Sequence, residues 1–419
     1  MVGNALSPHG GKLIERVIDP AQAQKEIQGL KQLPIRGQLA RECINIAYGF
    51  FSPLEGFMSR ADVDSVVKDM TLANGCVWSI PIVFDVSNAE IHEAGVKTGD
   101  VLLLTYQGNP LATLEVEEIY SYDKEVMARN VYGTTEEKHP GVRRTRAYKD
   151  KFIGGPVTLV NPPIINPPFD NFWFPPKALR ERFAERGWKR VVAHQTRNVP
   201  HAGHEWLMKG AWFAANADAI LVNPVIGEKR VGDYIDEAII LTHDALRKAG
   251  YFKEEIHMTS LLLWDMRYAG PREAVFHAIV RKNLGCTHHM FGRDHAGVGT
   301  YYDTYAAHRI FNEIPDLGIY PVKTLEWWYC PVCAGIAYEE QCGHANEAQK
   351  FSGSLIRSII EDGVKPPRLI FRPEVFDILM ECAERYGDGS PFVTESYLKR
   401  ADPVITVPPM TAPLKAGRG

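Results

Sequence analysis

Between Lys177 and Glu326 the chain alternates strand-like and helix-like patterns, and this alternation restricts the possible folds more than any other feature. Its strand-like runs are RVVAHQ, AILVNPVI, IHMTSLLLW and CTHHMFG, and the amphipathic stretches between them are HEWLMKGAWFAANA, DYIDEAIILTHDALRKAG and GPREAVFHAIVRKNLG. Strands that alternate with helices form a parallel sheet with right-handed crossovers. We therefore predict an α/β domain whose ligand site lies beyond the carboxyl ends of its strands.

The turn QTRNVPHAGHE follows the first of these strands and leads into the first helix. The first backbone N–H groups of a helix are unpaired and the helix dipole is positive at that end, so helix starts attract anions. His201 and His204 are three residues apart and are expected on one helix face. A polar turn with capping side chains would explain a pair of histidines alone. Arg197, Asn198 and Gln195 in the same turn favour a bound polyphosphate.

Other polar segments are expected at the same edge of the sheet. Asn223 is placed after the second strand, the segment from Trp264 to Arg272 after the third, and GRDHAGVG, residues 292–299, after the fourth. This coincidence predicts one composite site.

The segment GRDHAGVG has the composition of an anion-binding loop. Gly292, Gly297 and Gly299 are expected to allow left-handed backbone conformations and a nest of N–H groups. Arg293 would add a cationic fork, and Asp294 an acceptor for ribose hydroxyls. An ordinary strand-to-helix turn is the alternative for this loop taken alone.

Together these residues resemble the active-site motifs of the ATP sulfurylase (sulfate adenylyltransferase) family, within the nucleotidyltransferases that carry an HxxH turn. Further matches follow in family order along the chain. They are FSPLEGFM at 51–58, GEKRVGD at 227–233, MRYAGPREA at 266–274, SGSLIR at 352–357 and RPEV at 372–375.

The resemblance implies a reversible reaction in which sulfate attacks the α-phosphorus of ATP in line, giving adenosine 5′-phosphosulfate and pyrophosphate. It implies a sulfate site made by Gln195, Arg197 and the backbone near Ala296. It also implies Mg²⁺ bound with the nucleotide, and a homo-oligomer. The catalytic residues that it implies are Thr196, Arg197, Asn198, His201 and His204, and the ATP-binding residues are Gln195, Asn198, His201, His204, Gly292, Arg293, Asp294 and Phe351.

Residues before the α/β region carry short β-type runs such as VWSIPIVFDV, DVLLLTYQG and PLATLEVEEIY, separated by Gly, Asn and Pro turns. They predict a β-rich domain, with a hairpin at QGNPLA, and the resemblance implies a PUA-like barrel. The proline-rich segment NPPIINPPFDNFWFPP is expected as a linker that continues neither a ladder nor a helix. The predicted divisions are 1–166 for the PUA-like domain, 167–327 for the Rossmann-like nucleotidyltransferase domain, 328–400 for a small C-terminal domain and 401–419 for a tail.

Three cysteines lie close together near the end of the α/β region, in CPVC at 330–333 and QCGH at 341–344. Cys330, Cys333, Cys342 and His344 have the ligand types and spacing of a structural zinc site. A redox C-x-x-C and buried thiols are the alternatives. Some ATP sulfurylases resemble this pattern with a more distant histidine, which puts Asn346 near the fourth ligand position.

Composition limits the other functions. The net charge of −4 and the pI near 6.4 provide no global field for nucleic acid or an anionic membrane. No apolar run reaches the roughly 18 residues of a membrane span, and the N-terminus lacks the apolar region of a signal peptide, so a cytoplasmic protein is expected. The absence of GxxxxGK[ST] and the length exclude a P-loop kinase and a fused kinase domain, which leaves a monofunctional enzyme.

Two other functions are compatible with parts of the sequence. A different HxxH-type nucleotidyltransferase could share the catalytic domain, although it would not need all of the matching segments together. A PUA-like module with a zinc knuckle could bind nucleic acid, but the acidic balance and the lack of a basic, aromatic stripe disfavour this.

Overall fold

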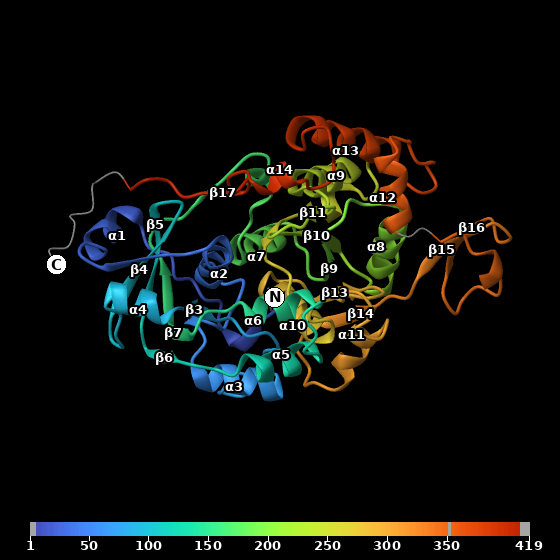
Figure 1. The fold of residues 1–419 in the computed structure, drawn as a ribbon. Coiled ribbons are helices and arrows are strands. Elements are labelled where there is room, and N and C mark those ends of the chain that lie inside the picture. The colour runs from blue at the N-terminus through green and yellow to red at the C-terminus, as the bar shows by residue number, and fades with distance from the viewer. Residues whose placement is uncertain (1–5, 351–352, 411–419) are drawn as a thin grey trace.

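The structure is a computed structural model that describes residues 6–350 and 353–410. The β-rich N-terminal part lies at the left of Figure 1, the parallel sheet with its helices at the centre, and a small hairpin extends at the right. The predicted combination of a β-rich domain with an α/β domain is confirmed.

The N-terminal part is built on a seven-stranded sheet with the order β1-β4-β5-β7-β2, in which β3 and β6 also pair with β7. The hairpin predicted at QGNPLA joins β4 to β5, and its turn residues Gln107 and Gly108 both have positive φ, as tight hairpin turns require. The strands are β1 (Lys31–Pro34), β2 (Gly56–Phe57), β3 (Phe84–Val86), β4 (Val101–Tyr106), β5 (Asn109–Glu115), β6 (Glu118–Tyr120) and β7 (Lys151–Leu159). The helices of this part are α1 (Pro20–Glu26), α2 (Gly37–Ala47), α3 (Arg60–Asp69), α4 (Asn88–Ala94), α5 (Lys124–Tyr132) and α6 (Pro140–Arg146), with the 3₁₀ turn η1 (His9–Gly11).

The central sheet is parallel and has the order β11-β10-β9-β13-β14, with β12 also paired to β10. Its strands are β9 (Val191–Thr196), β10 (Ala219–Ile226), β11 (His257–Thr259), β12 (Leu262–Leu263), β13 (His288–Phe291) and β14 (Tyr320–Lys323). The helices that accompany it are α7 (Pro176–Glu185), α8 (Ala202–Ala214), α9 (Asp236–Lys248), α10 (Pro271–Asn283) and α11 (Ala306–Arg309), with η3 (Glu254–Ile256) and η4 (Ile310–Asn312).

Every strand and helix predicted between Lys177 and Glu326 is present, but β14 was not predicted. Its sequence YPVK is short and contains Pro321, and Tyr320 is exposed. Such a segment is tolerated because it forms the edge of the sheet, where one side of the strand needs no partner.

The order of the central strands determines where a ligand binds. Along the chain β9 comes first, β10 and β11 follow on one side of it, and β13 and β14 follow on the other. The direction of winding therefore reverses between β9 and β13. In open parallel sheets the crevice at the carboxyl ends of such a pair is where ligands bind.

The C-terminal part packs back onto both preceding parts. Helix α13 (Pro373–Tyr386) lies along α9 at the top of Figure 1, and β17 (Ile405–Thr406) pairs with β8 (Ile164–Ile165). The prediction that the proline-rich segment continues no ladder was therefore wrong at β8, because two residues without proline intervene there. The remaining elements are η2 (Phe169–Phe172), β15 (Trp327–Cys330), β16 (Gly335–Tyr338), η5 (Ala345–Glu347), α12 (Gly353–Glu361) and α14 (Glu395–Leu398).

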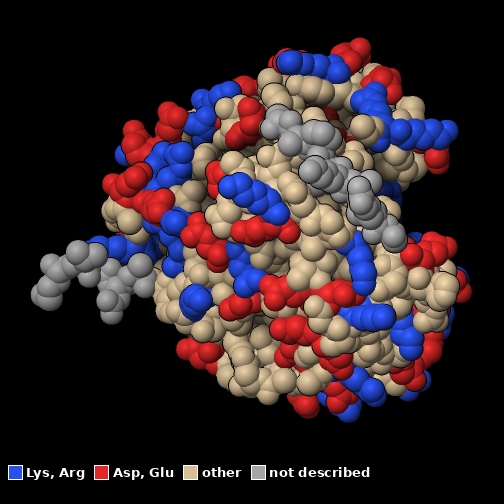
Figure 2. Space-filling view, turned by 90° about the vertical axis from the view of Figure 1, so that its left-hand side faces the viewer, with Lys and Arg blue, Asp and Glu red and all other residues tan. Residues whose placement is uncertain are grey.

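Basic and acidic side chains are interspersed on the face of the molecule that lies at the left of Figure 1, as Figure 2 shows. A uniformly basic surface is not formed by the described residues on this face. Among the helices in the described ranges, none combines the length and apolarity needed to cross a membrane.

Candidate active site

The loops that follow β9 and β13 line one cleft of about 330 Å³ at the carboxyl ends of these strands, where the direction of winding reverses. Met266 from the third loop, Glu326 just before β15 and Trp327 at the start of β15 also line it. The predicted site residues that the structure brings together here are Gln195, Thr196, Arg197, Asn198, His201, His204, Gly292, Arg293, Asp294 and Ala296. The predicted adenine contact Phe351 lies outside the described residues.

The turn after β9 is fixed by its own side chains. The hydroxyl of Thr196 accepts a hydrogen bond from the Asn198 backbone N–H and donates to the Asn198 carbonyl, both at 3.1 Å. The Asn198 carbonyl also accepts from Nε2 of His243 at 3.1 Å. Arg357 on α12 donates to Oδ1 of Asn198 at 3.2 Å. The turn is thus held by His243 of α9 and by Arg357 of the C-terminal part.

His201 is the N-cap of α8 and not a residue of its first turn, which corrects the prediction that it shares a helix face with His204. Its Nδ1 accepts from the Gly203 backbone N–H at 3.1 Å. The two imidazole rings still lie side by side, with centroids 4.0 Å apart. Since Nδ1 of His201 accepts, its Nε2 carries the proton and can donate to an anion.

Burial keeps the histidines around the cleft neutral. It lowers the pKa of His204 to about 4, and, together with the neighbouring His204, it lowers the pKa of His243 to about 3. Burial also holds the pKa values of His194 and His201 well below their ordinary value. At neutral pH these rings therefore act as N–H donors and acceptors, not as cations.

The loop after β13 adopts left-handed backbone conformations, but at other positions than predicted. Gly299 has a φ of 55°, as expected, whereas the other positive values belong to Asp294 (51°) and Ala296 (56°) and not to Gly292 or Gly297. The Gly270 N–H donates to the Ala296 carbonyl at 3.0 Å and holds the loop against the preceding one. Asp tolerates this conformation better than most residues.

Arg293 is engaged by two carboxylates beside the cleft. Its Nε lies 3.0 Å from Asp294, and its Nη1 lies 2.9 Å from Glu326. Glu326 also pairs with Lys350 at 2.6 Å. A phosphate entering the cleft would compete with these carboxylates for the guanidinium group.

The segment MRYAGPREA owes its shape to Glu273. This buried carboxylate accepts from Nε1 of Trp264 and the N–H of Arg267, both at 2.9 Å, and from the N–H of Ala269 at 3.1 Å. Asn223 was expected after its strand but lies within β10, fully buried, where it donates to the Ser260 carbonyl. Asn223 therefore joins two strand ends and does not face the cleft.

The predicted metal ligands Cys330, Cys333, Cys342 and His344 form a cluster in which the ligand atoms all lie within 4.8 Å of one another. The Sγ atoms of Cys333 and Cys342 are 3.8 Å apart, and Nδ1 of His344 lies 3.3 Å from the first and 3.6 Å from the second. Tetrahedral zinc with bonds of ~2.3 Å separates its sulfur ligands by about 3.7 Å. The cluster could therefore hold a metal ion.

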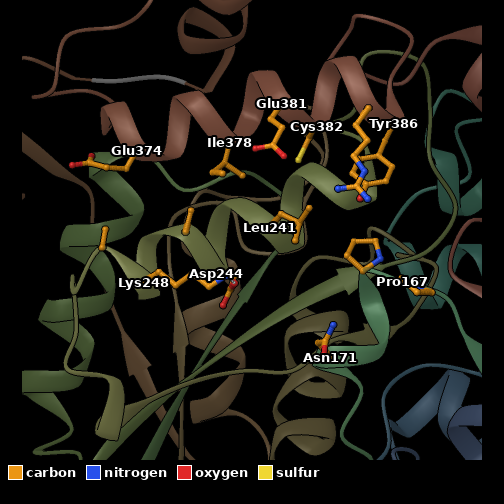
Figure 3. Close-up of a pocket in the computed structure, with 14 residues that line it drawn as sticks. Pro167, Asn171, Leu241, Asp244, Lys248, Glu374, Ile378, Glu381, Cys382 and Tyr386 are labelled. Atoms are coloured by element: carbon orange, nitrogen blue, oxygen red, sulfur yellow. Dashed lines mark ion pairs between the residues drawn. The ribbon is translucent and has the colours of Figure 1, made fainter.

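A larger cavity of about 650 Å³ lies between α9 and α13 (Figure 3). Leu241, Ile378 and Cys382 project into it, while Asp244 and Lys248 form an ion pair at its edge. None of the predicted site residues lines it. The volume of a cavity therefore does not identify the functional site, whereas the meeting of several predicted motifs in one cleft does.

Sequence reasoning missed several residues that line or support the cleft. Arg357 belongs to a matching motif, but its contact with Asn198 joins residues 159 positions apart. His295 lies inside GRDHAGVG and lines the cleft, and its position in that loop was the available signal. Trp327, whose ring covers Gly210 of α8, gave no signal in the sequence.

Comparisons with known proteins agree with this geometry. The family model described as ATP-sulfurylase matches residues 170–382, and the model described as a PUA-like domain matches residues 6–162. A sulfate adenylyltransferase of Archaeoglobus fulgidus is 43% identical over 97% of this chain and 98% of its own length. One of Hyperthermus butylicus is 44% identical over 91% of this chain and 97% of its own length.

A solved structure described as a hexameric APS kinase from Thiobacillus denitrificans has the same fold, with a TM-score of 0.70 and 22% identity, over 90% of this chain and 68% of that one. The family match covers the whole α/β domain, and the relatives span nearly the full chain. This chain belongs to the ATP-sulfurylase family.

Proposed function

We propose that this protein catalyses the sulfate adenylyltransferase reaction, ATP and sulfate to adenosine 5′-phosphosulfate and pyrophosphate, in both directions. The observation that carries the proposal is the cleft at the switch point, where the turn after β9 and the loop after β13 face each other. Relatives with that activity in their names match almost the whole chain.

The reaction requires positioning more than proton transfer. Sulfate is already deprotonated at neutral pH, so no general base is needed. One of its oxygens must lie in line with the α-phosphorus, and the charge that develops on pyrophosphate must be stabilised. Gln195, Arg197 and the backbone at Ala296 are proposed to hold sulfate, because the planar guanidinium fork matches a tetrahedral oxyanion.

The phosphates are proposed to lie over the start of α8. Thr196, Asn198, His201 and His204 line this side of the cleft. Burial keeps His201 and His204 neutral, so each ring would donate its one N–H group to the leaving pyrophosphate. The backbone N–H groups at the helix start add to this stabilisation.

The nucleoside is proposed to lie along the loop after β13. Gly292 allows close approach, Asp294 accepts from the ribose hydroxyls, and Arg293 exchanges Glu326 for phosphate. Phe351 is proposed at the adenine. Mg²⁺ bound to the phosphate oxygens would neutralise part of their charge.

The cluster of three cysteines and His344 is proposed to bind one structural zinc ion. Its hydrophobic core is small, formed by Trp328, Cys330 and Ala337 with two partly buried neighbours, so metal binding would supply much of its folding free energy. The protein is also proposed to form a homo-oligomer and to lie in the cytoplasm, where thiols stay reduced.

The test is ATP formation by the purified protein from adenosine 5′-phosphosulfate, pyrophosphate and Mg²⁺, followed with a luciferase assay. A boiled sample is the control, and sulfate-dependent pyrophosphate release from ATP tests the other direction. ATP formation that does not exceed the control, in protein with an intact circular dichroism spectrum, would refute the proposal. Release of pyrophosphate without sulfate would indicate a different nucleotidyltransferase.

A further inference from the structure

Tyr268 lies beside the proposed sulfate site and is contacted by two arginines. Nη1 of Arg197 donates to its hydroxyl oxygen at 2.5 Å, and Nη2 of Arg230 donates to the same oxygen at 2.9 Å. Both guanidinium groups also lie over the ring, each 4.8 Å from its centroid. Two cations thus converge on one neutral atom.

Such convergence is unfavourable without a counter-charge. Among the described residues, no carboxylate lies within ion-pair distance of Arg197, and Arg230 has only Asp233, at 3.9 Å. A phenol oxygen provides partial charge and two lone pairs, which offsets the repulsion of two guanidinium groups only in part. A dianion between the forks would offset it fully.

The backbone of Tyr268 is held in a conformation that a tyrosine rarely adopts. Its φ is 60°, a left-handed value that costs of order 1–3 kcal/mol outside glycine. Nε2 of His139 donates to its carbonyl at 3.1 Å, and Glu273 holds the next residue, Ala269. Surrounding contacts therefore fix Tyr268 at this position, which places its hydroxyl between the two arginines.

Arg230 belongs to a second cavity, of about 620 Å³, that adjoins the cleft. Met266 lines both cavities, and Nε2 of Gln195 lies 3.9 Å from its sulfur. Arg230 therefore reaches Tyr268 from this second cavity, while Arg197 reaches it from the cleft. Its side chain is 47% exposed, so its other guanidinium N–H groups can donate to a ligand while Nη2 stays bound to Tyr268.

We propose that Arg230 is a second sulfate-binding arginine, and that Tyr268 is a positioning residue that holds Arg230 and Arg197 at the two sides of one sulfate. A tetrahedral dianion has enough oxygens to accept from both forks. This inference rests on the proposed function and extends its sulfate site beyond Gln195, Arg197 and Ala296.

The experiment compares Arg230→Gln with Arg143→Gln. Arg143 on α6 lines the same cavity, so its substitution makes the same change in charge without removing a contact to Tyr268. Loss of a charge-assisted hydrogen bond predicts a rise in the KM for sulfate of about tenfold to a hundredfold for Arg230→Gln. The KM for ATP should stay within about twofold, and Arg143→Gln should leave both KM values within about twofold.

Tyr268→Phe and Arg230→Lys test the geometry of the clamp. The first keeps the ring and removes the shared acceptor, so it should also raise the KM for sulfate and leave the KM for ATP nearly unchanged. The second keeps the charge but not the fork, and should give an intermediate KM for sulfate. Because both residues act on one ligand, the effects of Arg230→Gln and Tyr268→Phe should not add in the double variant.

Three outcomes would overturn the inference. A KM for sulfate within twofold of the wild-type value in Arg230→Gln would remove Arg230 from the site. Equal increases in the KM for sulfate and the KM for ATP would indicate a general distortion of the cleft. Equal increases in the KM for sulfate in Arg143→Gln and Arg230→Gln would indicate that any positive charge lining the cavity has the same effect. A wild-type chain without sulfate-dependent activity would refute the proposed function as well, so the two failures are distinguishable.

Discussion

At the scale of single residues, the site depends on groups whose charge state and shape are fixed before any ligand binds. Arg197 offers a planar fork to sulfate, while the neighbouring histidines are neutral donors. The function of each group is therefore sensitive to conservative substitutions that keep its charge or its size but change its geometry.

Arg197→Lys should impair sulfate use far more than ATP binding. The ammonium group keeps the charge but cannot make two parallel hydrogen bonds to one oxyanion. We expect the KM for sulfate to rise by about tenfold or more, with the dissociation constant for ATP nearly unchanged by calorimetry. Arg182→Lys on α7 is the control, and equal losses for both substrates would show that Arg197 is not the sulfate clamp.

His243 should make stability depend on pH. Burial, together with the neighbouring His204, lowers its pKa from 6.5 to about 3, so between these values the unfolded chain binds a proton that the folded chain does not. The free energy of unfolding should therefore decrease as the pH falls from 6.5 towards 3, by up to ~1.4 kcal/mol per pH unit for this group.

His243→Gln isolates this contribution, because the amide can still donate to the Asn198 carbonyl but does not titrate. Urea unfolding between pH 7 and pH 4 should show a shallower decrease for the variant than for the wild type. Identical slopes would mean that His243 is not held neutral by the fold.

The residues of the site were predictable to different degrees. Gln195, Arg197, Asn198, His201 and His204 could be found because they are adjacent in one short turn whose position after a strand implies a ligand. Tyr268, Arg230 and Arg357 could not be assigned, because their contacts join segments separated by many residues. Single-sequence patterns identify local clusters, whereas partners across the fold depend on how the loops pack.

At the scale of elements, the hairpin of β15 and β16 links the cysteine cluster to the cleft. Trp327 at its base packs over Gly210 of α8, so closely that a Cβ atom there would lie 2.5 Å from the ring. Glu326 just before it holds Arg293. The position of the hairpin therefore influences both α8 and the loop after β13.

Cys330→Ser should release zinc and lower the melting temperature. Cys330 is fully buried within the small core of the hairpin, and metal binding is coupled to folding in such knuckles. Elemental analysis of protein prepared without chelator should give about one zinc per chain for the wild type and much less for the variant. Wild-type protein without zinc would contradict the metal assignment.

Two further variants make the zinc experiment specific. Cys76→Ser, which alters a half-buried thiol in the N-terminal part, should keep both the zinc and the melting temperature. His344→Ala should lose the metal if His344 is the fourth ligand, and zinc retained in that variant would assign the fourth position to another residue.

At the scale of the whole molecule, a buried ion cluster joins the three parts of the chain. Arg41 on α2 contacts Asp265 at 3.0 Å, in the segment that leads to Tyr268, and Asp402 of the C-terminal segment at 3.2 Å. Residues 401–419 were predicted from the sequence as a tail. Their described portion contacts the N-terminal part.

These contacts predict that the last described segment stabilises the entire fold. Val404, Ile405 and Val407 are buried, and Gln107 and Asn109 hydrogen-bond the backbone of Ile405 and Val407. Burial of these three aliphatic side chains, at roughly 1.5–3 kcal/mol each, would stabilise the folded state by several kcal/mol as an upper estimate.

A chain that ends at Arg400 should therefore unfold at a clearly lower temperature than one that ends at Met410, since the two chains differ only in this segment. Because Asp402 also neutralises Arg41 beside Asp265, the shorter chain should lose sulfate-dependent activity at temperatures where the longer chain remains active. Differential scanning calorimetry and activity after heating would measure both effects. Equal melting temperatures for the two chains would show that the segment packs onto the fold without stabilising it.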